Sequence, residues 1–81
     1  MSETAILLDS VDKVKSFVSI TRKFDAEMDL ISGRNVIRAK SIMGIFCMDL
    51  SKPMILRIYE GKENKDDIIE ALSEYVKEAR N

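Results

Sequence analysis

Residues 28–48 read MDLISGRNVIRAKSIMGIFCM, and this stretch decides the fold. Two short extended runs, at 28–31 and 36–39, flank the polar sequence Ser-Gly-Arg-Asn. Gly33 in that sequence can adopt a positive φ, which tight turns between antiparallel strands require. We therefore expect a β-hairpin, followed directly by a new element that begins near Ser41.

The run behind Ser41 has the composition of a short helix. A serine placed before apolar residues is typical of a helix N-cap, so we expect a helix over 41–48. Pro53 biases the residue before it away from helical geometry and separates this helix from the next run. Side chains of alternating character over 54–59 then indicate a strand, with Leu56 on its buried face.

The N-terminal part of the chain has the pattern of a strand followed by an amphipathic helix. Residues 4–8 are mostly β-branched or apolar, which favours a strand. Over 11–23, apolar residues recur at helical spacing. Ser10 is the expected N-cap, and Asp12 lies in the first turn, where a carboxylate suits the helix dipole. We expect this helix to end near Lys23.

The C-terminal part has the pattern of a second amphipathic helix. Asn64 is the expected N-cap, followed by acidic residues in the first turn. We expect one continuous helix that carries Lys77 and Arg80 in its last turns, where cations stabilise the terminal carbonyl groups. Its apolar stripe consists of Ile68, Ile69, Leu72, Tyr75, Val76 and Ala79.

The element order is therefore β-α-β-β-α-β-α. Four strands with their helices on one face give an α+β open-faced β-sandwich. The hairpin makes the second and third strands neighbours, whereas the pattern alone leaves the rest of the strand order open. The expected core contains Val14, Phe17, Val18, Leu56, Ile58, Leu72 and Val76.

Composition argues against several classes of function. The 81 residues are 46% hydrophobic and 33% charged, as expected for a single globular domain over 1–81. The 13 basic and 14 acidic residues give a net charge of −1, so no positive excess favours a nucleic-acid partner. The apolar runs are too short for a membrane span, and the N-terminus lacks the pattern of a signal peptide. A single cysteine, Cys47, forms no internal disulfide, and these features together favour the cytoplasm.

Three motifs in the centre of the chain resemble a known family. They are KFDAEM at 23–28, AKSIMGI at 39–45 and LSK at 50–52. These motifs resemble segments of HPr, the histidine-containing phosphocarrier protein of the bacterial sugar phosphotransferase system, and the similarity runs without gaps from about 23 to 58. The resemblance implies a four-stranded antiparallel sheet of order 1-4-2-3 with three helices on one face.

In this family the serine of the second motif is a regulatory site, and here that serine is Ser41. The resemblance implies phosphorylation by an ATP-dependent kinase, as in many Gram-positive bacteria. A phosphate beside a helix N-terminus meets unpaired backbone N–H groups, and Lys40 is adjacent in sequence. The alternative interpretation is that Ser41 only caps the helix.

The chain departs from the family at the site that accepts the phosphoryl group. It contains no histidine, and the resemblance places Ser10 at the position of the family histidine and Asp12 at that of a family arginine. A serine hydroxyl is a weak nucleophile without a base, and a carboxylate repels an incoming phosphate. We therefore interpret Ser10 and Asp12 as a degenerate phosphocarrier site and expect no enzymatic activity. The remaining way in which the chain could carry a phosphoryl group is as an acyl phosphate on Asp9 or Asp12.

The apolar residues behind Ser41 cannot all point inward from so short a helix. In the family, exposed residues of this helix dock onto partner proteins. The corresponding positions here are Ile42 and Phe46, with Met43 contributing in part. We expect Ile45 and Met48 to lie in the core and Cys47 to be half-buried.

The leading hypothesis is an HPr-like regulator or adaptor that is switched by phosphorylation of Ser41, similar to the catabolite-repression HPr, which also lacks the active histidine. Its expected partners are proteins: a kinase or phosphatase that acts on HPr, and a transcriptional regulator or components of the phosphotransferase system. One alternative is a phosphocarrier with altered acceptor chemistry, and another is an interaction module that is never phosphorylated. With no histidine and one cysteine, nothing in the sequence supports a metal site or a cofactor.

Overall fold

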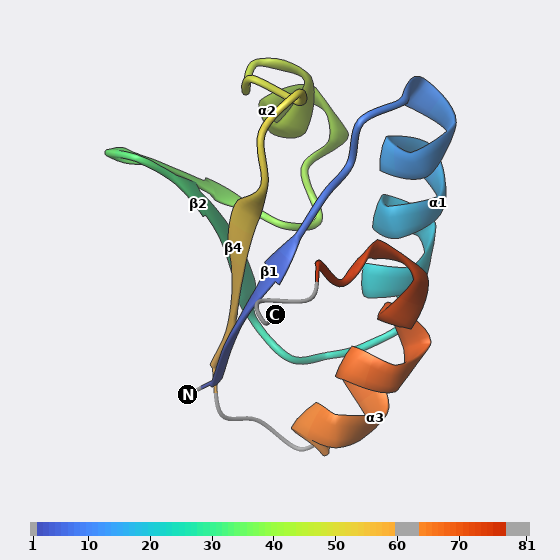
Figure 1. The fold of residues 1–81 in the computed structure, drawn as a ribbon. Helices are drawn as coiled ribbons and strands as arrows, with labels where there is room; N and C mark the ends of the chain where they lie inside the picture. The colour runs from blue at the N-terminus through green and yellow to red at the C-terminus, as the bar shows by residue number, and fades with distance from the viewer. Residues whose placement is uncertain (1, 60–63, 78–81) are drawn as a thin grey trace.

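The computed structural model describes residues 2–59 and 64–77 of the chain (Figure 1). Its elements follow the order expected from the sequence, with a 3₁₀ turn added at the end. They are β1 (Ser2–Ile6), α1 (Val11–Thr21), β2 (Met28–Ser32), β3 (Asn35–Arg38), α2 (Ile42–Phe46), β4 (Met54–Ile58), α3 (Lys65–Ala71) and η1 (Ser73–Tyr75).

The four strands form one antiparallel sheet in the order β1-β4-β2-β3. This confirms the strand order that the family resemblance implied. The central strand β4 pairs Leu56 with Thr4 of β1 on one side and with Leu30 of β2 on the other. The helices pack against one face of this sheet, and Figure 1 shows α1 and α3 on the same side of it.

The core lies between that face of the sheet and the helices. Alternate residues of each strand point into it, because successive side chains in a strand project to opposite faces. The Phe17 ring of α1 meets the Tyr75 ring edge-on, with the ring centroids 5.8 Å apart. Every expected core residue is buried except Val76, which is half-buried. Among the fully buried side chains are Val14, Phe17, Leu30, Leu56, Ile68 and Leu72.

The hairpin has the geometry expected from its turn residues. Ser32 pairs with Asn35, which leaves Gly33 and Arg34 as a two-residue loop. Gly33 has a φ of 60°, a value that glycine adopts without the steric cost of a side chain. The boundaries of the first strand differ from those expected. The first strand covers 2–6 and not 4–8, because its pairing with β4 ends where Ile6 meets Met54.

The expectation of one long C-terminal helix is wrong. α3 ends at Ala71, and the chain continues through the 3₁₀ turn into an extended residue, Val76. Val76 forms an antiparallel bridge with Ile6, and the backbone N–H of Lys77 donates to the Ala5 carbonyl oxygen at 2.8 Å. β1 is an edge strand whose outer backbone groups need partners, and these hydrogen bonds outweigh continuation of the helix. Lys77 is therefore not in a helical turn, whereas the expected positions of Ala79 and Arg80 lie outside the described residues.

The other helices are shorter than expected by about two residues. α1 ends at Thr21, so the basic residues Arg22 and Lys23 follow its last turn. α2 covers 42–46, and Cys47 is its C-cap. Within residues 2–59 and 64–77, no helix has the length and apolar character that a membrane crossing requires.

Candidate functional site

Ser41 is the N-cap of α2, as the sequence predicted. Its backbone is extended, with φ −100° and ψ 102°, and its hydroxyl oxygen accepts a hydrogen bond from the Gly44 N–H at 3.1 Å. Its carbonyl oxygen accepts from the Ile45 N–H at 3.0 Å. The hydroxyl thus satisfies one of the N–H groups that lack a partner within the first turn. The side chain is half-buried, so part of it faces solvent.

Gly44 keeps the space beside this hydroxyl open. A Cβ atom at position 44 would lie 3.2 Å from Ser41 Oγ and 3.5 Å from Ile37 Cβ. A side chain here would therefore press on the Ser41 hydroxyl, whereas its contact with Ile37 of β3 would be an ordinary one. The sequence signal for this contact is the single glycine inside an otherwise apolar run.

Two cations lie near the start of α2, but neither contacts the Ser41 hydroxyl. The ammonium group of Lys40 donates to the Phe24 carbonyl oxygen at 2.6 Å, so it ties the segment before α2 to the end of α1. The guanidinium of Arg22 donates to the Lys40 carbonyl oxygen at 3.4 Å. Lys40 is adjacent to Ser41 in the sequence, whereas the sequence gives no sign of Arg22, because Arg22 reaches this segment only through the packing of the two helices.

α2 presents an apolar patch to solvent. Met43 is the most exposed part of it at 77%, and Phe46 is 41% exposed. These residues are three apart and therefore neighbours on one helix face. Ile42 is half-buried and packs against the core, so it contributes less exposed surface than expected.

The remaining residues of this segment divide between core and surface. Ile45 is fully buried and Met48 is half-buried against the core, which confirms their expected positions. Cys47 is exposed, which corrects the expectation of a half-buried thiol. The cause is that α2 stops at Phe46, so residue 47 lies on the outer side of the turn that follows.

Ser10 and Asp12 lie at the N-terminus of α1. The Ser10 hydroxyl oxygen accepts from the Lys13 N–H at 3.1 Å, and Asp12 is exposed in the first turn. The Lys13 ammonium forms an ion pair with Asp9 at 2.9 Å. This hydrogen bond from Lys13 lowers the pKa of the Asp9 carboxyl below its ordinary value.

These contacts bear on the expectation that Ser10 does not accept a phosphoryl group. A serine nucleophile needs an adjacent base to take its proton. The nearest carboxylate in sequence, Asp9, is engaged by Lys13, and a lowered pKa makes it a weaker base. Within the described part of the chain, no group of three or more acidic, cysteine or histidine side chains has the geometry to hold a metal ion.

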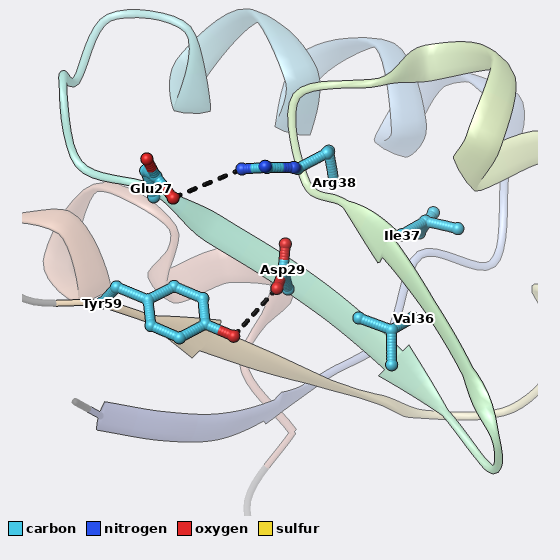
Figure 2. A pocket seen from close by; sticks show the side chains of 6 residues that line it. All are labelled: Glu27, Asp29, Val36, Ile37, Arg38 and Tyr59. Carbon is cyan, nitrogen blue, oxygen red and sulfur yellow. Dashed lines mark hydrogen bonds and ion pairs between the residues drawn. The ribbon is translucent and has the colours of Figure 1, made fainter.

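A shallow hollow on the sheet was not anticipated from the sequence. It encloses about 270 Å³ and is lined by Glu27, Asp29, Val36, Ile37, Arg38 and Tyr59. Figure 2 shows the Tyr59 hydroxyl directed at the Asp29 carboxylate, to which it donates at 2.9 Å. Arg38 reaches Glu27 at 3.4 Å. The sequence feature that could have indicated the hollow is the alternation of side chains along the strands, which places these polar side chains on the face away from the helices.

The sequence matches one family, and the fold matches solved members of it. The family described as "PTS HPr component phosphorylation site" matches residues 13–78. HPr-C-His from Thermoanaerobacter tengcongensis is 25% identical, with a TM-score of 0.76 over 91% of this chain and 89% of that one. The phosphocarrier protein HPr from Bacillus anthracis is also 25% identical, with a TM-score of 0.68 over 94% of this chain and 96% of that one.

A third structure supports the fold alone. The histidine-containing phosphocarrier protein of a Mycoplasma is 12% identical, with a TM-score of 0.71 over 90% of this chain and 89% of that one. No curated protein matches the chain.

Proposed function

Because the chain belongs to the HPr family of phosphocarrier proteins of the phosphotransferase system, we propose that it is a regulator or adaptor of that system, switched by phosphorylation of Ser41 and not itself a phosphoryl carrier. The observation that carries the proposal is a contrast between two serines. Ser41 caps α2 beside an exposed apolar patch. Ser10, at the α1 terminus, stands where the resemblance places the phosphoryl-accepting histidine of the family, and the chain contains no histidine.

The surroundings of Ser41 favour a phosphate in two ways. First-turn N–H groups of α2 lack carbonyl partners within the helix, and a phosphate can accept from them. Lys40 directly precedes Ser41, and Arg22, the C-cap of α1, reaches the same segment by donating to the Lys40 carbonyl oxygen. Both cations are bound to carbonyl oxygens that a phosphate would outcompete as acceptors. Since α2 has only five residues, we assign the larger part of this effect to the cations and not to the helix dipole.

Phosphorylation would act on partner binding more than on the fold. A phosphoserine adds about −1.5 to −2 charges near pH 7. That charge would lie two residues before Met43 and five before Phe46, at the start of the same short helix. There it disfavours contact with an apolar or acidic partner surface and attracts a surface that offers arginine. The partner classes that fit are a kinase or phosphatase acting on Ser41, and a transcriptional regulator or phosphotransferase-system component that docks on α2.

The test is to treat the folded protein with ATP and an HPr kinase, to map the phosphosite, and to measure partner affinity and thermal stability. We expect modification at Ser41, a changed partner affinity, and a melting temperature close to that of the unmodified protein. Ser41→Ala should abolish the modification and the change in affinity.

A matched pair of variants locates the docking surface. Phe46→Ala should weaken partner binding in both phosphorylation states, whereas Val36→Ala, which removes a similarly exposed side chain from β3, should leave it unchanged. The proposal fails if the kinase ignores Ser41 in the folded protein, or if modification leaves every affinity as it was. In that case Ser41 is a capping residue only.

A further inference from the structure

The sheet face away from the helices carries a row of alternating charges. Glu3 pairs with Arg57 across β1 and β4, Arg57 with Asp29 across β4 and β2, and Asp29 with Arg38 across β2 and β3. Directly opposed residues of an antiparallel sheet project to the same face. The four side chains therefore form one row across the whole sheet, with the sign order negative, positive, negative, positive.

An apolar row runs beside this charged row. Ala5 pairs with Ile55, Ile55 with Ile31, and Ile31 with Val36. Two of these side chains are large and exposed, Ile55 at 37% and Val36 at 56%. The helices pack on the other face of the sheet (Figure 1), and no described helix covers this one. The open face thus carries an apolar row and a charged row side by side, with the boundary between them running across the strands, and Glu27 and Tyr59 lie beyond the charged row.

We propose that this open face is the interface of a symmetric homodimer, in which a second copy packs face to face about a two-fold axis parallel to the strands. Such an axis reverses the strand order of the second copy. The charged row of one copy still faces the charged row of the other, and the apolar row faces the apolar row. Glu3 then faces Arg38 of the second copy, and Arg57 faces Asp29 of the second copy. All four facing pairs in the charged row have opposite signs, which makes this surface its own electrostatic complement.

The apolar row obeys the same symmetry. Ala5 faces Val36 of the second copy, so a small side chain meets a larger one, and Ile55 faces Ile31. A two-fold axis across the strands fits less well. If that axis passes through the charged row, each charged residue faces the identical residue of the second copy, which has the same charge. If the axis passes between the rows, the charged row of one copy faces the apolar row of the other. The pattern therefore selects one arrangement, within the rotation of about 30° that packed sheets show.

The hollow lies on the β2–β3 half of the open face. The proposed axis brings Glu3 and Arg57 of the second copy over it, where Asp29, Arg38 and Tyr59 offer partners (Figure 2). The facing side chains are already ordered by their own contacts. Arg57 is 2.7 Å from Glu3, and Tyr59 holds Asp29 at 2.9 Å. Ordering before association reduces the conformational entropy lost in forming the dimer.

The expected dimer is weak. Four strands about 4.8 Å apart form a narrow face, which buries less than the roughly 800 Å² per partner of a standard interface. We therefore expect the wild-type chain to associate only at concentrations approaching millimolar. Salt should weaken the association, because the facing charges lie at the edge of the interface.

A pair of charge variants gives the decisive experiment, measured by sedimentation equilibrium from micromolar to millimolar protein. Glu3→Arg with Asp29→Arg makes the row entirely positive, and Arg38→Glu with Arg57→Glu makes it entirely negative. Each variant alone should stay monomeric at every concentration. An equimolar mixture should form a heterodimer at least about tenfold tighter than the wild-type homodimer, because pairing also relieves like-charge repulsion within each row.

A pair of single variants keeps the test decisive if a charge variant fails to fold. Ile55→Asp should abolish the wild-type dimer, whereas Phe46→Asp, on the α2 patch, should leave it intact. A wild-type chain that stays monomeric at millimolar concentration overturns the proposal. So does a mixture of folded charge variants without association, or a dimer that Phe46→Asp breaks and Ile55→Asp does not. None of these outcomes bears on phosphorylation of Ser41.

Discussion

The Gly44 N–H donates to the Ser41 hydroxyl across 3.1 Å, and the same hydroxyl is the proposed phosphate acceptor. One oxygen atom thus has a structural role and a proposed regulatory role. The two roles are compatible, because a phosphoserine oxygen can accept from the same N–H group. They are also separable, because stability measurements report on the cap and phosphorylation assays report on the switch.

Removal of the cap should destabilise the protein in the absence of any kinase. We expect Ser41→Ala to lower the free energy of unfolding by about 0.5–2 kcal/mol, because the Gly44 N–H loses its acceptor. Ser10→Ala removes the equivalent cap of the longer helix α1 and should cost a similar amount or more. Urea denaturation measures both. Ser16→Ala, on the exposed side of α1, is the control, and equal effects of all three variants would contradict the capping role.

The core assignment predicts larger effects at two leucines. Leu56 of β4 and Leu72 after α3 are fully buried from opposite sides of the same core. Replacement of either by alanine should cost on the order of 2–5 kcal/mol, which is a large share of the stability of a small domain. Chemical denaturation checks this, with the exposed Val36→Ala as a control that should stay within about 0.5 kcal/mol. A loss that small at both leucines would show that the core is assigned wrongly.

Local patterns predicted the elements well and predicted contacts between distant segments poorly. The turn at Gly33 and the caps at Ser10, Ser41 and Asn64 depend on residues within a few positions, and the structure confirms each of them. The sheet order came from the family resemblance and not from periodicity. The end of α3 was predicted wrongly, because the apolar stripe continues in helical register past Leu72.

Apart from the early end of α2, which exposes Cys47, the features that the sequence did not predict depend on tertiary contacts. The stripe beyond Leu72 is broken by pairing with β1, which a helical pattern cannot reveal. The bond from Lys40 to the Phe24 carbonyl and the approach of Arg22 depend on how α1 meets α2. The alternation within the strands did separate the two faces of the sheet. The charged row appears only once the register of all four strands is known.

The interpretation of Ser10 and Asp12 as a degenerate carrier site predicts a negative result in a phosphotransfer assay. Incubation with phosphoenolpyruvate and enzyme I should leave residues 9–12 unmodified, because the chain has no histidine and the Lys13 ion pair engages Asp9. Mass spectrometry under conditions that preserve labile phosphates gives the readout. A histidine-containing HPr is the positive control. A hydroxylamine-labile phosphate on Asp9 or Asp12, or an acid-stable phosphate on Ser10, would instead support a carrier with altered chemistry.

The C-terminal segment makes the last prediction, which concerns the edge of the sheet. The Lys77 N–H donates to the Ala5 carbonyl oxygen at 2.8 Å, and Lys77→Pro removes that donor. Val76 already has the extended backbone that a following proline requires, so the substitution tests the hydrogen bond with little added strain. We expect a loss of about 0.5–1.5 kcal/mol in unfolding free energy. Amide exchange should also accelerate at Leu7, whose N–H donates to the Tyr75 carbonyl oxygen across the same edge.

Lys65→Pro is the matched control for that variant. Lys65 is the first residue of α3, where proline is tolerated because the N–H has no helical partner, and Asn64 before it is extended. The same change of residue type should therefore be nearly neutral at position 65 and destabilising at position 77. Equal stability of the two variants, with unchanged exchange at Leu7, would mean that residues 75–77 do not protect the β1 edge. A loss of stability only in the Lys77→Pro variant would establish that residues 75–77 pair with the edge of β1 and do not continue α3 as a helix.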